Sequence, residues 1–276
     1  MFRRILIGGL DSDLRLADIL LADALTSYAK VLGDTAMVVC MFSSGYSSTN
    51  PMPDRSCGSS FLVPCVIALP YLIRLRQCLT EYRRARAEDL PASAAHLYNA
   101  LKYASAFPVI ALGTLERNSL AAPSIFSKDG LTRGWYAAVM ANTLFSFYWD
   151  VTHDWQLTLF TTATATGGGG GGGSGGSGGS DGSYPFGLRR HRHFVTAELY
   201  YIAIALDFLL RCAWSVKLSP HLDVLSEMEG GIFVLELLEV FRRWLWLFFR
   251  VEKEFVAGKE TAPAEEEGIV MDEFRD

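Results

Sequence analysis

Cysteine is scarce in this sequence of 276 residues, and the patterns that bind zinc or begin a secreted protein are missing. The five cysteines are scattered, with no CxxC or Cys/His spacing, which argues against a disulfide scaffold and a zinc site. The net charge is −5 and no basic face stands out, so a nucleic-acid-binding protein is not expected. Residues 1–15 lack an apolar core followed by small residues, so no cleavable signal peptide is expected either.

Charge is scarce as well. Charged residues make up 20% of the sequence, against about 25% in an average soluble domain, while 50% of the residues are hydrophobic. The apolar residues gather in six blocks, each near the roughly 20 residues that cross a bilayer. These blocks are 19–42, 61–79, 97–115, 135–160, 194–218 and 232–249. We expect an all-α polytopic membrane protein with about six transmembrane helices, several of them kinked; a soluble helical bundle is the alternative.

Prolines within the blocks predict where the kinks lie. The second block holds Pro64 and Pro70, and the third holds Pro108 near its middle. Proline inside a polar-containing span is typical of transporters, because the freed backbone groups line a cavity. The expected helices therefore enclose a charged pathway.

Basic residues divide unequally between the two expected sides of the membrane. With the N-terminus in the cytoplasm, thirteen Lys and Arg residues fall on the cytoplasmic side and five on the other. This asymmetry fits the positive-inside rule and predicts that both termini are cytoplasmic. The expected organisation is a cytoplasmic segment 1–17, a transmembrane domain 18–254 with a flexible Gly/Ser loop at 161–183, and an acidic cytoplasmic tail 255–276.

Ionisable residues inside the apolar blocks are the most informative feature of the sequence. Each costs about 2.5–3.5 kcal/mol at the bilayer centre, so it persists where it pairs, faces water or has a function. The residues are Asp23, Lys30, Asp34, Arg74, Lys102, Asp150, Asp154, Asp207, Arg211, Glu239, Arg242 and Arg243.

Helical spacing pairs several of these charges, because residues three or four apart share a face. Lys30 and Asp34 are so spaced, and so are Asp207 and Arg211. The interpretation for Lys30 and Asp34 is mutual neutralisation within the bundle. Glu239 precedes two adjacent arginines, Arg242 and Arg243, which point in different directions. One glutamate cannot satisfy both of these arginines.

Two carboxylates, Asp150 and Asp154, share one helical face between two tryptophans. Such a pair relays protons, binds a cation or balances basic residues on other helices. His153 lies between them and permits a metal site, but one helix cannot wrap these three side chains round an ion. Counter-charge is therefore the preferred interpretation, and no metal or cofactor is expected. Because no nucleophile–base pair is present, an enzyme is not expected.

The basic residues of separate blocks predict an anion pathway. Guanidinium groups offer forked donors that match the oxygens of a multivalent anion, and lysine adds a point charge. The acids would keep such a site from binding too tightly for release. The residues are Arg74, Lys102, Arg211, Arg242 and Arg243. Trp214 follows Arg211 by three positions and is either a pore-lining gate or a packing residue.

The segments that hold these charges resemble the EXS family, which includes phosphate exporters that serve as xenotropic and polytropic retrovirus receptors. The resemblance rests on NALKY, YWDVxxDW, LRxAW and EVFRRxxWxFFRVE, which occur in family order. It covers most of residues 18–254, and the first segment, DILLADALTSYAKVLGD, is most similar to the fungal ER-retention-defective Golgi branch.

The resemblance implies an inorganic phosphate transporter or channel of the Golgi membrane. Such a protein returns lumenal phosphate to the cytosol and supports glycosylation and the retention of ER and Golgi proteins. The implied pathway residues are Asp23, Arg74, Lys102, Tyr103, Asp150, Asp154, Arg211, Trp214, Glu239, Arg242 and Arg243. The implied partners are phosphate, the lipid bilayer, a second copy in a homodimer, and Golgi glycosyltransferases or coat components through loops and tail.

The sequence also departs from the family pattern. No SPX domain precedes the first block, so gating by inositol pyrophosphates is not expected. The chain starts close to that block, whereas family members usually have further helices upstream. Val63 stands where the family has a pathway arginine. The alternative function is that of a non-transporting membrane adaptor that sorts or recycles Golgi glycosyltransferases.

Overall fold

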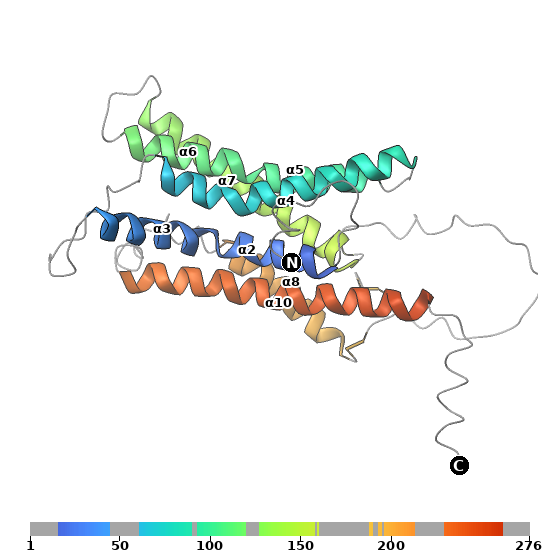
Figure 1. Cartoon of the computed structure of the whole chain (residues 1–276). Coiled ribbons are helices and arrows are strands. Elements are labelled where there is room, and N and C mark those ends of the chain that lie inside the picture. The colour runs from blue at the N-terminus through green and yellow to red at the C-terminus, as the bar shows by residue number, and fades with distance from the viewer. Residues whose placement is uncertain are drawn as a thin grey trace, which may run out of the picture. The chain divides into compact units, whose positions relative to one another are not determined.

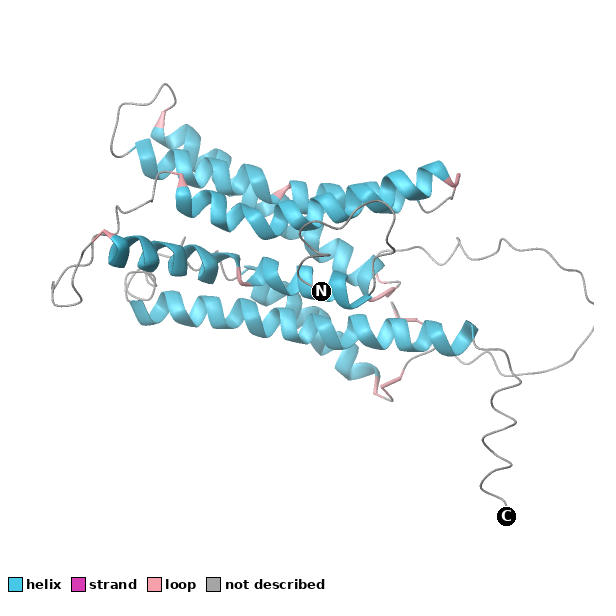
Figure 2. Ribbon diagram, in the orientation of Figure 1, coloured by secondary structure: helices cyan, strands magenta, loops and turns pink. Residues whose placement is uncertain are grey.

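The described part of the chain is entirely helical. The computed structural model describes residues 16–44, 61–89, 93–119, 127–157, 159, 188–189, 193–194, 196–212 and 229–261. No strand occurs within these ranges (Figure 2). The prediction of an all-α protein is therefore confirmed for this part of the chain. The Gly/Ser loop and Trp214 lie outside the described residues.

The helices follow the six predicted blocks (Figure 1). The first and third blocks are each divided into two helices, and the helices of the second, fourth and sixth blocks extend beyond the predicted bounds. Helix α10 continues beyond Glu254 into the segment that the sequence assigns to the acidic tail. The elements are α2 (Leu16–Ser27), α3 (Ala29–Ser43), α4 (Leu62–Ala87), α5 (Ser93–Ala104), α6 (Ala106–Ser119), α7 (Lys128–Trp149), the π-helix η1 (Asp150–Asp154), α8 (Ala197–Arg211) and α10 (Glu229–Thr261).

Among the described helices, α4 alone is long and apolar enough to cross a membrane, and the bent pair α2 and α3 adds a second span if it is counted as one. Helix α8 has 15 residues, which is short of the roughly 20 that a bilayer requires. Helix α10 has 33 residues but carries many ionisable side chains. The count of six transmembrane helices stays a prediction.

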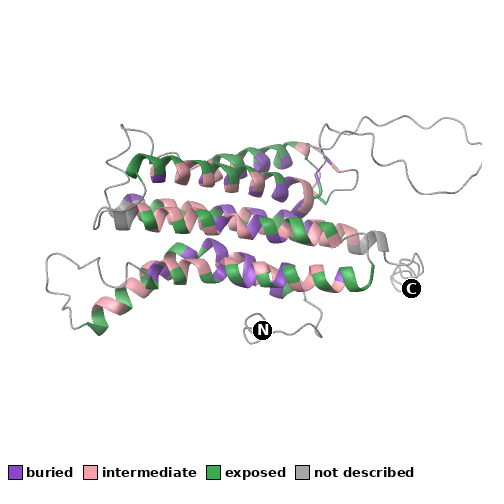
Figure 3. Ribbon diagram, turned by 90° about the horizontal axis from the view of Figure 1, so that it is seen from above, coloured by how far each residue is buried: buried purple, intermediate pink, exposed green. Residues whose placement is uncertain are grey.

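The chain divides into two compact units. The first contains residues 1–147 and 210–243, and the second contains residues 148–209 and 244–276. The division falls within α7, α8 and α10, so these three helices contribute residues to both units. Buried and exposed residues alternate along the helices (Figure 3).

Helix α4 is the central helix of the first unit. It contacts α2, α3, α5 and α6, and it lies beside α5 in Figure 1. On its two faces, Ile73 packs with Ala22 of α2, and Cys78 packs with Ala100 and Tyr103 of α5. Because α4 has neighbours on several sides, the residues it carries are placed relative to most of this unit.

The first predicted block is broken at Tyr28, where α2 and α3 meet at an angle of 62°. No proline or glycine stands at this point. Instead the Thr26 hydroxyl donates a hydrogen bond to the carbonyl oxygen of Asp23 at 2.7 Å. Such bonds from a hydroxyl to the preceding turn bend helices. The Tyr28 backbone, with φ −89° and ψ 3°, lies in the bridge region that ends a helix.

The third predicted block is broken at Ser105, between α5 and α6. Pro108 lacks the N–H group that would bond to the carbonyl of Ala104, so the ladder is interrupted there. In the first turn of α6 this missing donor costs nothing, because the first four N–H groups of a helix have no partner within it. The helix is thus interrupted close to Pro108, where the sequence predicts a kink. In the second block, by contrast, α4 continues through Pro64 and Pro70 as one helix.

Gly33 gives the first testable prediction, because α3 approaches α4 closely there. A Cβ atom at Gly33 would lie 2.8 Å from Cγ1 of Ile67, whereas at Gly134 the nearest atom is 3.7 Å away. Alanine gains about 1 kcal/mol of helix propensity at both positions. The difference in unfolding free energy between Gly33→Ala and Gly134→Ala therefore isolates the clash, which we expect to cost about 1–3 kcal/mol. Equal unfolding temperatures of the two variants in detergent would contradict the close approach.

Aromatic residues form the core of the second unit. Trp155, Trp246 and Tyr200 are almost fully buried. The ring of Phe249 lies 5.1 Å from that of Trp155 and 5.3 Å from that of Tyr200. Trp155 Nε1 donates to the carbonyl oxygen of Trp246 at 3.3 Å. These contacts join the segment after η1 to α8 and α10.

Candidate functional site

A polar cavity of about 460 Å³ lies in the first unit, with a lining drawn from α2, α3, α4, α5, α7, α8 and α10. The charged residues in the described part of its lining are five cations and two acids, an excess of three positive charges. They are Lys30, Lys102, Arg211, Arg242 and Arg243, with Glu236 and Glu239. A cavity with this balance favours an anion over a cation.

Arg242 and Glu239 form a two-point ion pair on α10. Arg242 Nε donates to Glu239 Oε2 at 2.9 Å, and Nη2 donates to Oε1 at 2.5 Å. The Arg242 side chain is buried. The prediction that Glu239 pairs along its helix is therefore confirmed for one of the two adjacent arginines.

Arg243 reaches across to α2. Its Nε donates to the Ser27 hydroxyl at 3.0 Å, and its Nη2 donates to the Thr26 hydroxyl at 3.2 Å. Ser27 in turn donates to Glu239 Oε1 at 2.9 Å. Hydroxyl groups orient a guanidinium without cancelling its charge. The end of α2, next to the break at Tyr28, thus positions the second arginine of the cavity.

Asp23, Arg74 and Tyr103 form a buried cluster that joins α2, α4 and α5. Arg74 Nε donates to Asp23 Oδ1 at 2.8 Å, and Arg74 Nη2 donates to the Tyr103 hydroxyl at 3.1 Å. The Tyr103 hydroxyl donates to the Asp23 carboxylate. Arg74 Nη1 also donates to Gln77 Oε1 at 2.6 Å. Tyr103 lines the cavity, whereas Asp23 and Arg74 are not among its lining residues.

Lys102 and one face of α7 complete the cavity. Lys102 is buried, and its Nζ lies 5.4 Å from the centre of the Tyr103 ring. The lining residues of α7 are Val139, Asn142, Thr143 and Ser146, which share one helical face. Asn142 Oδ1 accepts a hydrogen bond from Ser105 at 2.7 Å, at the break between α5 and α6. Three of these residues, Asn142, Thr143 and Ser146, thus add neutral hydrogen-bonding groups to the lining.

Two of the predicted pathway residues belong to the second unit. Asp150 and Asp154 are the first and last residues of the π-helix η1, where Trp155 N donates to the carbonyl oxygen of Asp150 at 2.9 Å. The α-helical face expected from their spacing is thus replaced by a wider turn. Asp154 Oδ1 lies 3.7 Å from Arg250 Nη1, so the prediction that it balances a basic residue on another helix is confirmed.

His153 also lies in η1, and its ring stacks on that of Trp149 with the centroids 3.9 Å apart. His153 Nδ1 is 2.7 Å from the Thr152 hydroxyl oxygen. Over the described residues, no group of three or more His, Cys, Asp or Glu side chains is arranged to hold a metal ion.

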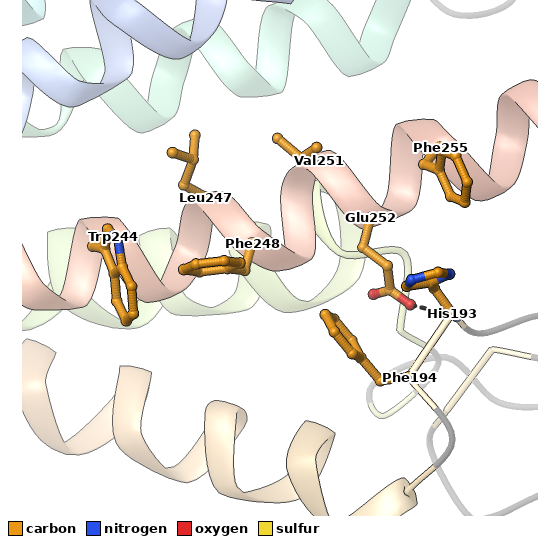
Figure 4. Close-up of a pocket in the computed structure, with 8 residues that line it drawn as sticks. All are labelled: His193, Phe194, Trp244, Leu247, Phe248, Val251, Glu252 and Phe255. Carbon is orange, nitrogen blue, oxygen red and sulfur yellow. Dashed lines mark hydrogen bonds between the residues drawn. The ribbon is translucent and has the colours of Figure 1, made fainter.

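A second cavity of about 390 Å³ lies in the second unit and is mainly apolar (Figure 4). Glu252 is the one acidic residue in the described part of the lining, and Oε1 of that side chain accepts a hydrogen bond from the backbone N–H of His193 at 2.8 Å. The Tyr200 hydroxyl also donates to Glu252, and Arg189 forms an ion pair with it. Among the described residues, no lysine or arginine lines this cavity, so its described lining does not suit an anion.

Several cavity residues were missed by sequence reasoning, because that reasoning followed charge within the predicted spans. Thr26, Ser27 and Tyr71 stand on α2 and α4 without a distinctive spacing. The polar residues of α7 had a signal: Asn142, Thr143 and Ser146 repeat at helical spacing inside an apolar block. A search for neutral polar stripes would have found them.

Comparison with known proteins identifies one family and several similar proteins. The sequence profile of the EXS family matches residues 1–256. The chain is 32% identical over 263 residues to Protein ERD1 homolog 1 of Schizosaccharomyces pombe, covering 94% of this chain and 62% of that protein. It is 33% identical over 251 residues to Protein ERD1 of Kluyveromyces lactis, covering 90% of this chain and 61% of that protein.

A more distant relative is the Xenotropic and polytropic retrovirus receptor 1 homolog of Xenopus laevis. The identity is 29% over 255 residues, which cover 86% of this chain and 32% of that protein. The chain therefore spans less than two thirds of the length of each of these relatives.

Proposed function

The chain belongs to the EXS family, and we propose that it is a polytopic membrane protein that carries inorganic phosphate across a Golgi membrane. In this proposal it acts as a transporter or channel and not as an enzyme. It returns lumenal phosphate to the cytosol, which supports glycosylation and the retention of ER and Golgi proteins.

The cavity of the first unit is the observation that carries this proposal. Five cationic side chains from four helices, α3, α5, α8 and α10, line it, together with hydroxyl and amide groups. Guanidinium groups present donors in a fixed fork that matches two phosphate oxygens at once. Arg211, Arg242 and Arg243 provide such forks from α8 and α10, and Lys102 provides a point charge from α5.

The acids in and around the cavity favour passage over tight binding. Glu239 offsets Arg242, and Glu236 lines the same cavity. Conduction requires that an anion bind well enough to enter and weakly enough to leave. A net excess of cations that is partly offset by carboxylates meets both requirements.

The proposal places the N-terminus in the cytoplasm, and two observations support this orientation. The first is the excess of basic residues on the side assigned to the cytoplasm. The second is Cys40, near the end of α3, which is disulfide-bonded. Disulfides persist in oxidising compartments such as the secretory lumen and are rare in the cytosol. The far end of α3 would then face the lumen, which fits a cytoplasmic N-terminus.

Flux of labelled phosphate from proteoliposomes tests the proposal. We expect the wild-type protein to release phosphate and the double variant Arg211→Ala with Arg243→Ala to lose at least about 90% of this flux, because two of the three guanidinium forks are gone. The control is Arg83→Ala, which removes an exposed arginine of α4 that does not line the cavity. Absence of flux in the wild type, or equal flux in the double variant, would contradict the proposal.

A further inference from the structure

Lys30 differs from the other cations of the cavity in its exposure. It stands on α3 just beyond the break at Tyr28, and its side chain is 52% exposed. Arg242 and Lys102, by contrast, are 3% and 5% exposed. Lys30 also lies outside the set of residues that the family resemblance assigns to the pathway. Its position marks the rim of the cavity, because it is the one exposed residue among the five described cations of the lining.

Two carboxylates hold Lys30 at this rim. Its Nζ donates to Asp34 Oδ2 at 2.6 Å and lies 3.7 Å from Glu236 Oε1. The second distance is too long for a hydrogen bond, and Glu236 Oε1 accepts none from the described residues. Lys30 therefore has one bonded carboxylate and a second one within reach.

The contacts of Lys30 are weak enough to exchange. In the proposed function the cavity is a water-filled pathway, and water in it screens an exposed ion pair at this helical spacing, so the pair contributes little. A phosphate oxygen in the cavity competes with Asp34 for the same ammonium group, and the four-carbon stem of lysine allows the head group to move. The buried Arg242, held at two points by Glu239, has no such freedom.

We propose that Lys30 is the capture residue of the phosphate pathway. Its ammonium group gives up its bond to Asp34 in order to bind an anion at the rim, and it returns to Asp34 and Glu236 when the anion moves inward. This inference rests on the proposed function, and it adds a residue and a step to it. In the orientation proposed above, Lys30 captures phosphate from the lumenal side.

Concentration-dependent phosphate flux in proteoliposomes tests the inference. We expect Lys30→Gln to raise the half-saturating phosphate concentration about fivefold, the effect of one partly screened charge, while the maximal flux changes less than about twofold. Lys30→Arg should restore capture. The matched control is Lys253→Gln, which removes another lysine paired with a carboxylate, at 2.9 Å from Glu254, and which lines neither cavity.

A double variant separates capture from a structural role. Asp34→Asn releases Lys30 and should lower the half-saturating concentration, but it should have no effect when Lys30→Gln is already present. The inference would be overturned if Lys30→Gln had the same half-saturating phosphate concentration as the wild type. It would also be overturned if Asp34→Asn still changed that concentration in the Lys30→Gln background. If the wild type shows no flux at all, the proposed function itself fails.

A lipid headgroup offers the same chemistry as free phosphate, so the assay is run with and without phosphatidic acid in the liposomes. The inference requires the Lys30→Gln effect in both membranes. An effect confined to liposomes with phosphatidic acid would assign Lys30 to lipid binding and overturn the inference.

Discussion

Asp23→Ala is expected to lower the free energy of unfolding by about 3–5 kcal/mol, because it leaves the Arg74 guanidinium buried without its carboxylate. Arg74 and Asp23 are 3% and 2% exposed, so water cannot replace the lost contact. For a chain of this size the midpoint of thermal unfolding should fall by about 10 °C. Thermal unfolding of the purified protein in detergent measures this loss.

Asp34→Ala is the matched control for this experiment. It removes an aspartate from the adjoining helix whose lysine partner is exposed, so we expect a loss of about 0.5 kcal/mol or less. Replacing both partners, as Asp23→Leu with Arg74→Met, should recover most of the stability, because a buried pair often exchanges for apolar residues at little cost. Equal melting of Asp23→Ala and Asp34→Ala would show that the cluster is not buried as described.

Glu252→Ala is expected to destabilise the second unit by a similar amount, about 3–5 kcal/mol. Glu252 is buried on α10 and accepts bonds from Tyr200 and the backbone N–H of His193, and it pairs with Arg189. Alanine leaves the Arg189 charge and two donors without this acceptor. Because Trp155 and Trp246 are in the same unit, tryptophan fluorescence during thermal unfolding should report the loss.

Glu254→Ala provides the control on the same helix. Its side chain is 34% exposed and pairs with Lys253 and Arg250, so its removal should cost less than about 1 kcal/mol. Glu252→Gln keeps the acceptor oxygen but not the charge, and its stability should lie between those of the wild type and Glu252→Ala. If Glu252→Ala and Glu254→Ala unfold at the same temperature, the network around Glu252 does not stabilise the unit.

Local features of the fold could be predicted from sequence because they depend on neighbouring residues. Pro108 lacks a donor, so the break before it follows from covalent chemistry. The ion pairs of Lys30 with Asp34 and of Glu239 with Arg242 follow from helical spacing. The break at Tyr28 was not predicted, because it depends on a hydroxyl that bonds back to the preceding turn.

The tertiary arrangement of the site required the structure. Asp23 and Arg74 were both identified as intramembrane charges, but 51 residues separate them and no periodicity relates them. Helical spacing indicated that Glu239 cannot satisfy both adjacent arginines, but it did not identify Ser27 and Thr26 on α2 as the partners of Arg243. Such partners depend on which helix faces which, and the sequence pattern of one helix does not contain that information.

The buried pair of Asp23 and Arg74 also has a consequence for the order in which the proposed membrane protein is assembled. The two residues lie on consecutive predicted spans, so α2 is synthesised before α4. Alone in a bilayer, each charge costs about 2.5–3.5 kcal/mol. Pairing removes much of that cost for both helices at once. We therefore expect stable residence of α2 in the membrane to depend on the arrival of α4, so that the first two predicted spans insert cooperatively.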